Sequence, residues 1–345
     1  MAEITIDVIK IFVLGACGFI VAFLLTPNLT NFLYKHKLWR KEVRKKAIDG
    51  GEVSFFQKFH AKGETQTPRF GGVLIWTTTL ILAFLFFGLA KITDIWWFDK
   101  LNFLSRSQTW LPLFTLVFAS LVGLADDSLQ VLGKGKHLQK GLSLKYRLAL
   151  VGILGLIGAW WFFFKLGWST FHIPGVGDFE IGFWYIPLFI ITMIATYSGG
   201  IIDGLDGLAG GAFAAIFAAF AAIALFSNQI DVAAFCAVIF GTILAFLWFN
   251  IPPARFYMGE TGILGLTTTL TVVAFLTNSV FVLPIIGFLL VIESGSVILQ
   301  LLSKKFRGKK IFLAAPIHHH FEALGWPHYK VTMRFLVIGV VMAII

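Results

Sequence analysis

The chain has 345 residues, of which 58% are hydrophobic and only 13% are charged. A soluble domain carries about 25% charged residues, so this composition excludes an ordinary soluble protein and makes lipid the solvent for most of the chain. The formal net charge of +10 does not indicate nucleic acid as a partner, because the basic residues lie in short segments between apolar runs. That distribution is typical of membrane topology.

The apolar runs predict an all-α polytopic membrane protein with ten transmembrane helices in a single domain, 1–345. A bilayer core about 30 Å thick requires roughly 17–25 apolar residues in each helix. The predicted spans, in chain order, are 8–27, 72–90, 110–125, 147–165, 182–198, 208–226, 232–249, 262–277, 280–302 and 331–345. No cleavage site follows the first span, so we expect it to remain as an anchor.

Lysine and arginine predict the orientation of these spans. If the N-terminus is outside, the odd-numbered loops and their edges are cytoplasmic and hold 23 of the 28 basic residues. Because basic residues concentrate on the cytoplasmic side, we expect both termini to be extracytoplasmic. The same side then collects the polar clusters that could carry chemistry, so we expect the active site on the cytoplasmic face. These clusters are Asp126–Asp127, Asp203–Asp206, Glu260 and His318–His320.

Asp126 and Asp127 directly follow the apolar run LVFASLVGLA. Two adjacent carboxylates at the C-terminal end of a helix repel each other. They also meet the negative end of the helix dipole, which disfavours them. They are candidates for a metal ligand, a base or a nucleophile, and the alternative is two solvated acids in a loop.

The segment Asp203-Gly204-Leu205-Asp206-Gly207 joins the fifth and sixth spans. Its glycines permit a tight turn or a close approach of the backbone. Asp203 and Asp206 are spaced to share one face of a helical turn. An N-cap needs only one aspartate, so the presence of two favours a functional site over a simple cap.

The segment from Asn250 to Gly262 is rich in turn-forming residues and contains a ring, an amide and an acid. Tyr257 has a face on which a base can stack, and the amide of Asn250 can read a base edge. Glu260 adds a carboxylate. The alternative is an ordinary proline-capped loop between helices.

His318, His319 and His320 are consecutive, so they cannot all point at one metal ion from a regular helix or strand. Hydrogen bonds to phosphate, or orientation of a neighbouring acid, suit them better, and the alternative is a solvated polar loop. Glu293 lies inside the ninth predicted span, with Ser296 and Gln300 on the same stripe. Because an acid inside a span normally faces the bundle interior, we interpret this stripe as a structural seam, with a role in a site as the alternative.

Four lysines crowd the segment after the aspartate pair, namely Lys134, Lys136, Lys140 and Lys145. They fit the topology signal, and they also fit attraction of an anionic substrate or a lipid head group. Together with the carboxylates, they indicate an anionic, nucleotide-like substrate. Phosphoryl transfer needs positioning and neutralisation of charge, and Mg²⁺ prefers carboxylate and phosphate oxygens, so we expect Mg²⁺ as the cofactor.

These motifs resemble the phospho-N-acetylmuramoyl-pentapeptide transferase family, a branch of the polyprenyl-phosphate N-acetylhexosamine-1-phosphate transferases. The strongest match runs from Glu293 to Phe335 and contains APIHHHFE and LGWP. The elements GLADD, DGLDGLAGG and FNIPPARFYMGETG match in the family's order, and TPRFGG matches more weakly.

The resemblance implies transfer of phospho-MurNAc-pentapeptide from UDP-MurNAc-pentapeptide to undecaprenyl phosphate, with Mg²⁺, to give lipid I and UMP. It implies a multi-pass protein of the bacterial inner membrane, held in the lipid bilayer, with a homodimer as a candidate assembly. The catalytic residues that it implies are Asp126, Asp127, Asp203, Asp206, His318, His319 and His320. The substrate-binding residues are Lys62, Lys134, Lys140, Lys145, Asn250 and Tyr257, and the metal site is Glu260 with Asp203.

The chain departs from the family's pattern in four places. The family's PTMGG is Pro68-Arg69-Phe70-Gly71-Gly72 here, and the third loop is a few residues longer than expected. The other two departures bear on the metal site. The family usually has Met-Gly-Asp where this chain has Met258-Gly259-Glu260, and an asparagine-rich run where this chain has the segment 198–202. We expect the absence of a side chain at Gly200 to make room for the longer Glu260, so that the metal site is rearranged and retained.

Two other functions remain open from the sequence, and a third possibility is a pure scaffold, which would not need these motifs together. A related transferase would use another UDP-N-acetylhexosamine, although the HHH run and the Pro-Pro-Ala loop favour the muramoyl-pentapeptide branch. A secondary transporter would place ionisable residues near the midplane of the membrane, often in two repeated halves. Here Glu293 alone lies deep in a predicted span, and the other polar clusters lie at one surface.

Overall fold

The computed structural model describes residues 2–41, 65–105, 108–133 and 141–345. Eight helical segments within this part of the chain are long and apolar enough to cross a membrane, and they coincide with the first eight predicted spans. They contain α1 (Ala2–Lys35), α3 (Gly72–Ile92), α5 (Trp110–Val131), α6 (Leu144–Trp160), α7 (Tyr185–Ser198), α8 (Leu208–Phe226), α9 (Ile230–Asn250) and α10 (Gly259–Leu276). The prediction of a helical, polytopic membrane protein is therefore confirmed.

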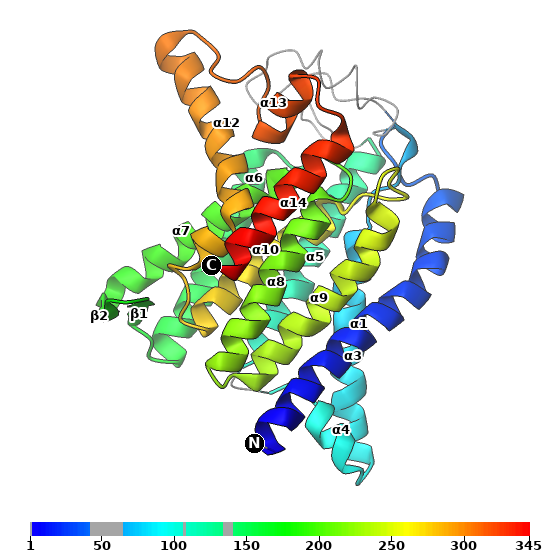
Figure 1. Ribbon diagram of the computed structural model, residues 1–345, viewed down its shortest axis with the longest axis vertical. Helices are drawn as coiled ribbons and strands as arrows, with labels where there is room; N and C mark the ends of the chain where they lie inside the picture. The colour runs from blue at the N-terminus through cyan, green and yellow to red at the C-terminus, as the bar shows by residue number, and fades with distance from the viewer. Residues whose placement is uncertain (1, 42–64, 106–107, 134–140) are drawn as a thin grey trace.

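The last two predicted spans differ from the other eight. The ninth is broken at Gly287 into α11 (Leu283–Ile286) and α12 (Phe288–Arg307), and the tenth coincides with α14 (His328–Ile344). Neither α12 nor α14 is among the eight helices that meet both criteria for a span. In Figure 1 the outer end of α12 projects away from the bundle. The total of ten spans and the orientation of the termini remain predictions.

The expectation of an all-α chain is wrong in one segment. An antiparallel hairpin, β1 (Thr170–Ile173) and β2 (Gly177–Glu180), lies between α6 and α7. Gly175 and Gly177 adopt positive φ angles and reverse the chain there. The remaining elements are short: α4 (Trp96–Leu101), the π-helix η1 (Trp161–Lys165), the 3₁₀ helices η2 (Gly182–Trp184) and η3 (Gly199–Ile202), and α13 (Ile317–Ala323).

Helix α10 lies at the centre of the bundle, in contact with α3, α5, α6, α7 and α8 (Figure 1). It is almost completely buried although it is rich in threonine. The hydroxyls of Thr267 and Thr268 donate to the carbonyls of Ile263 and Leu264, at 2.7 and 2.6 Å. Such bonds within the helix satisfy hydroxyl groups that would otherwise be unpaired in an apolar interior.

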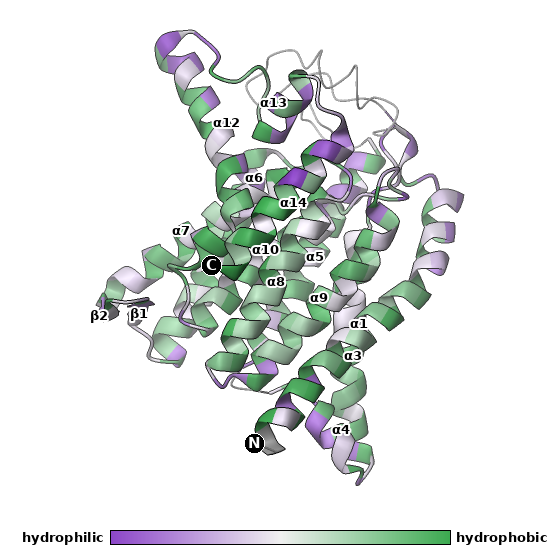
Figure 2. Ribbon diagram, in the orientation of Figure 1, coloured by the Kyte–Doolittle hydropathy of each residue, from purple (hydrophilic) through white to green (hydrophobic). Residues whose placement is uncertain are grey.

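Hydrophilic residues concentrate at one end of the bundle, the end at which α13 lies (Figure 2). We refer to this end as the polar end. The middle of the bundle is apolar, as expected for helices surrounded by lipid. The N-terminus lies at the opposite end (Figure 1).

Helices α1 and α9 approach closely at Gly241, and this contact can be tested. A β-carbon at Gly241 would lie 1.9 Å from the carbonyl oxygen of Gly15. We expect Gly241→Ala to lower the unfolding temperature in detergent, because overpacking costs about 1–3 kcal/mol. Gly88→Ala is the matched control, since no atom lies within 4 Å of a β-carbon there. Equal unfolding temperatures for the two variants would contradict the α1–α9 packing.

Candidate active site

Asp126 and Asp127 lie inside α5, which continues to Val131. The prediction that they fall in a loop after the helix is wrong, because the helix extends beyond the apolar run. Asp126 is 2% exposed and Asp127 is 0% exposed, so they are not solvated loop acids. Two carboxylates at such depth require partners for their charge.

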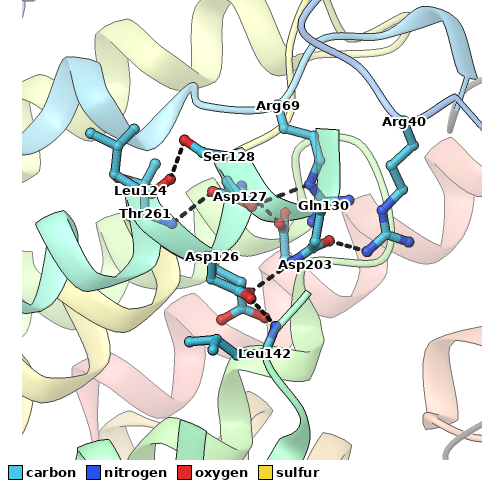
Figure 3. Close-up of polar contacts among 12 residues, drawn as sticks. Arg40, Arg69, Leu124, Asp126, Asp127, Ser128, Gln130, Leu142, Asp203 and Thr261 are labelled. Carbon is cyan, nitrogen blue, oxygen red and sulfur yellow. Dashed lines mark hydrogen bonds and ion pairs between the residues drawn. The ribbon is translucent and has the colours of Figure 1, made fainter. Parts of the chain in front are cut away.

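The partners of Asp126 come from its own helix and from the start of α6. The Arg147 guanidinium lies 2.8 Å from Oδ2 of Asp126. The Gln130 amide donates to the same oxygen at 2.8 Å, and the Leu142 backbone N–H donates to Oδ1 at 2.5 Å (Figure 3). Three donors therefore fix the orientation of this carboxylate.

Asp127 and Asp203 both accept hydrogen bonds from the N-terminal turn of α10. The N–H of Thr261 donates to Asp127 Oδ2 at 2.9 Å, and the N–H of Gly259 donates to Asp203 Oδ2 at 3.2 Å. The first N–H groups of a helix have no partner within the helix, and the helix dipole favours negative charge there. The guanidinium of Arg69 also lies 3.4 Å from Asp127 (Figure 3).

Gly259 is required at this junction for two reasons. Its φ angle is +73°, which side chains other than glycine rarely adopt. A β-carbon there would also lie 2.5 Å from Oδ2 of Asp127. The glycine therefore allows the carboxylate of Asp127 to lie directly against the start of α10.

The surroundings of Asp203 raise its pKa above that of an exposed aspartate. Burial raises the pKa of Asp203 to about 6, although Arg69 and the N–H of Gly259 act in the opposite direction. The negative charges of Asp127 and Glu260 contribute to the increase in this pKa. Asp127, Asp203 and Glu260 therefore lie close enough together to influence one another.

Glu260 lies in the first turn of α10 and joins the same network. Its carboxylate forms an ion pair with Arg147 and accepts a hydrogen bond from the Tyr197 hydroxyl at 3.3 Å. Arg147 thus bridges Asp126 and Glu260. The expected compensation by Gly200 is wrong, because a β-carbon at Gly200 would lie 2.3 Å from the side chain of Ile263.

The turn 203–207 lies between η3 and α8 and is not helical, since Gly207 has a φ angle of +79°. Asp206 therefore points to a different partner from Asp203, and its Oδ2 accepts from the Ala254 N–H at 3.0 Å. The Gly207 N–H donates to Asn250 Oδ1 at 2.9 Å. The Asn250 amide in turn donates to the Phe256 carbonyl at 2.8 Å, so Asn250 joins this turn to the loop before α10.

Tyr257 lies in that loop and is partly buried. Its backbone N–H donates to the Pro68 carbonyl, and its carbonyl accepts from the Gly71 N–H, each at 2.8 Å. Burial raises the pKa of Tyr257 to about 12, with Asp206 and Asp203 contributing. The hydroxyl of Tyr257 is therefore protonated at neutral pH and lies near both aspartates.

The three consecutive histidines lie at the start of α13 and take three separate partners. Nδ1 of His318 lies 2.8 Å from the Glu293 carboxylate. Nδ1 of His319 lies 2.5 Å from Glu322. His320 accepts a hydrogen bond from the Leu313 N–H at 3.2 Å. The expectation that these rings pair with neighbouring acids holds for the first two.

The structure describes only one of the four predicted substrate-binding lysines. Lys62, Lys134 and Lys140 lie outside the described residues. Lys145 is exposed in the first turn of α6. Among the described residues, Arg69 and Arg147 pair with the carboxylates of the site. In the sequence both count as topology signals, and Arg69 also lies in the weak TPRFGG match. The sequence does contain a signal for Arg147, which is a charged residue at the beginning of an apolar span.

The carboxylates offer oxygen ligands of the kind that Mg²⁺ prefers. Within the described segments, no three His, Cys, Asp or Glu side chains are grouped to hold a metal ion on their own. Magnesium is often bound by one or two carboxylates together with substrate phosphates. Asp203, with Asp127 and Glu260 near it, fits that kind of site.

A bundle of apolar helices with buried carboxylates and guanidinium groups at one end has the properties of a membrane enzyme that handles anions. Comparison with known proteins specifies the class further. The profile of glycosyl transferase family 4 matches residues 109–278, which extend from the start of α5 to the turn after α10.

Three relatives match over nearly the whole chain, and each is named phospho-N-acetylmuramoyl-pentapeptide-transferase. The protein of Lactiplantibacillus plantarum is 35% identical over 95% of this chain and 94% of its own length. That of a Geobacillus strain is 33% identical, with the same coverage, and that of Clostridium perfringens is 34% identical over 97% of both chains. The chain therefore belongs to the phospho-N-acetylmuramoyl-pentapeptide-transferase family.

The bridging role of Arg147 predicts a loss of stability when its charge is removed. Arg147→Gln leaves Asp126 and Glu260 without their shared cation, and breaking a buried ion pair costs about 3–5 kcal/mol. We expect a clear decrease in the unfolding temperature in detergent. Arg307→Gln, at an exposed position at the end of α12, should leave that temperature unchanged. A similar unfolding temperature for both variants would argue against the bridge.

Proposed function

We propose that the protein transfers phospho-MurNAc-pentapeptide from UDP-MurNAc-pentapeptide to undecaprenyl phosphate, giving lipid I and UMP. The observation that carries this proposal is the network of Asp126, Asp127, Asp203 and Glu260 with Arg69 and Arg147 at the polar end of the bundle. One substrate is soluble and the other has a lipid tail, so their phosphates can meet only at a membrane border. Membership of the family supports the same reaction.

The reaction exchanges one phosphorus–oxygen bond for another. An oxygen of the lipid phosphate attacks the phosphorus that carries the sugar, and the bond from that phosphorus to the UMP oxygen breaks. Catalysis of such a transfer depends mainly on positioning and on neutralisation of charge. Arg147 and Arg69 supply positive charge, and the oriented carboxylate of Asp126 takes a proton from the lipid phosphate when one is present.

The nucleotide binds, in this proposal, against the loop before α10. Tyr257 offers the stacking face for uracil. Asn250 contributes by shaping that loop, because both ends of its amide bond the backbone. The histidines of α13 line the sugar-phosphate side, and Lys145 meets phosphate from the first turn of α6.

Mg²⁺ is the proposed cofactor, held by Asp203 and Glu260 with Asp127 close to them. When bound, it neutralises charge on the diphosphate. The carboxylate of Asp203 is kept in place by the N–H of Gly259, so the chain itself fixes the direction of that ligand. We also propose that the polar end faces the cytoplasm of a bacterial inner membrane, because the UDP-sugar is soluble.

Asp126→Asn tests the proposal directly. We expect wild-type protein with radiolabelled UDP-MurNAc-pentapeptide, undecaprenyl phosphate and Mg²⁺ to form a lipid-linked product, and the variant to lose most of that activity. A general acid or base contributes about 10²–10⁴-fold. Asp99→Asn is the control, because Asp99 is exposed in α4 at the opposite end of the bundle (Figure 1).

Two outcomes would overturn parts of this proposal. Absence of lipid-linked product from the wild type would remove the transferase function, and full activity of Asp126→Asn would remove the role of Asp126. Unlabelled UDP-GlcNAc is not expected to compete. Effective competition would favour the related transferase that uses another UDP-N-acetylhexosamine.

A further inference from the structure

We infer that Glu293 is a positioning residue for His318. Its carboxylate orients the imidazole ring so that Nε2 faces the turn 203–207. In this orientation Nε2 accepts a hydrogen bond from a hydroxyl or an amide N–H of the UDP-sugar. The inference rests on the proposed function, since the turn 203–207 carries the aspartates assigned to the substrate. It concerns a residue in the middle of α12 that the reaction scheme does not use.

Glu293 and His318 form a buried pair. Both side chains are 0% exposed, and His318 Nδ1 lies 2.8 Å from Glu293 Oε2. A carboxylate oxygen accepts hydrogen bonds, so the tautomer assigned from this contact has its proton on Nδ1. The other ring nitrogen, Nε2, is then an acceptor in the neutral imidazole. The carboxylate thus determines both the tautomer and the direction of the ring, as carboxylates do for ligand histidines in metal sites.

The edge of the His318 ring that carries Nε2, opposite the contact with Glu293, faces the turn 203–207. A β-carbon at Gly204 would lie 2.3 Å from Nε2 and 2.8 Å from the neighbouring ring carbon Cε1, so the ring lies directly against the backbone of Gly204. Nε2 is buried and has no hydrogen-bond partner. Buried polar atoms are seldom left unpaired, so Nε2 is suited to accept a donor from the substrate once the turn 203–207 shifts to admit it.

Two further buried polar residues on α12, Gln300 and Ser303, make a different kind of contact from Glu293. The Gln300 amide donates to the Phe312 carbonyl at 2.9 Å and accepts from the N–H groups of Ile311 and Phe312. The Ser303 hydroxyl donates to the Lys309 carbonyl at 2.9 Å. These two residues hold the backbone of the connection between α12 and α13. Glu293 instead holds a side chain, so its removal should affect His318 specifically.

A double-mutant cycle separates this role from general stability. We expect Glu293→Ala and His318→Ala each to raise KM for UDP-MurNAc-pentapeptide about tenfold, the equivalent of one lost hydrogen bond, with a smaller change in kcat. If Glu293 acts through His318, the double variant should be no worse than His318→Ala alone. Glu293→Gln should remain close to wild type, because its amide oxygen can still accept the proton of Nδ1.

Ser303→Ala is the matched control, since it removes one hydrogen bond from the same buried stripe and should leave KM unchanged. If Glu293→Ala does not fold in detergent, Gly204→Ala provides a second cycle. Its β-carbon displaces the ring, so it should raise KM in the wild type and have no further effect in His318→Ala.

The outcomes distinguish this inference from the proposed function. The positioning role would be overturned if the two increases in KM multiply in the double variant. It would also be overturned if KM is unchanged in Glu293→Ala or in Gly204→Ala. Either result would leave the proposed transferase function intact. Absence of wild-type turnover would remove the proposed function, and the inference with it.

Discussion

The arrangement of the polar end depends on the buried N-terminus of α10. The first N–H groups of a helix need acceptors from outside the helix, and Gly259 and Thr261 at the start of α10 are buried. Asp127 from α5 and Asp203 from the turn before α8 provide those acceptors. Burial of the carboxylates in turn requires cations, which Arg69 and Arg147 provide. The contacts that hold the start of α10 in place are therefore the same contacts that assemble the site.

The turn 203–207 extends this constraint to the other candidate residues. Asp203 contacts the start of α10, Asp206 contacts the loop at Ala254, and Gly204 lies against His318. One short turn thus joins the segment 254–259 to α13, although these two regions are far apart in sequence. Because its glycines permit both positive φ and close approach, the turn can make all three contacts at once, which one N-cap aspartate could not do.

The sequence predicts the elements of this architecture better than their connections. Apolar runs locate the eight long helices, because the requirement to cross lipid is a local property of the chain. The predicted ends of the helices are less reliable. Helix α5 continues past Asp127, and a short helix forms at His318, between the ninth and tenth predicted spans. Ion pairs such as Arg147–Glu260 join residues more than 100 positions apart. No pattern of spacing encodes them, since they arise only when α6 and α10 meet.

The departure at Glu260 is explained by its neighbours on α6 and α7. The longer side chain reaches Arg147 and the Tyr197 hydroxyl, whereas the space at Gly200 faces Ile263. Arg147 also holds Asp126, so a change in the length of the acid at position 260 alters the position of the guanidinium that orients Asp126. The acid proposed as a metal ligand and the acid proposed as a base are therefore coupled through one arginine, and their geometry cannot be adjusted independently.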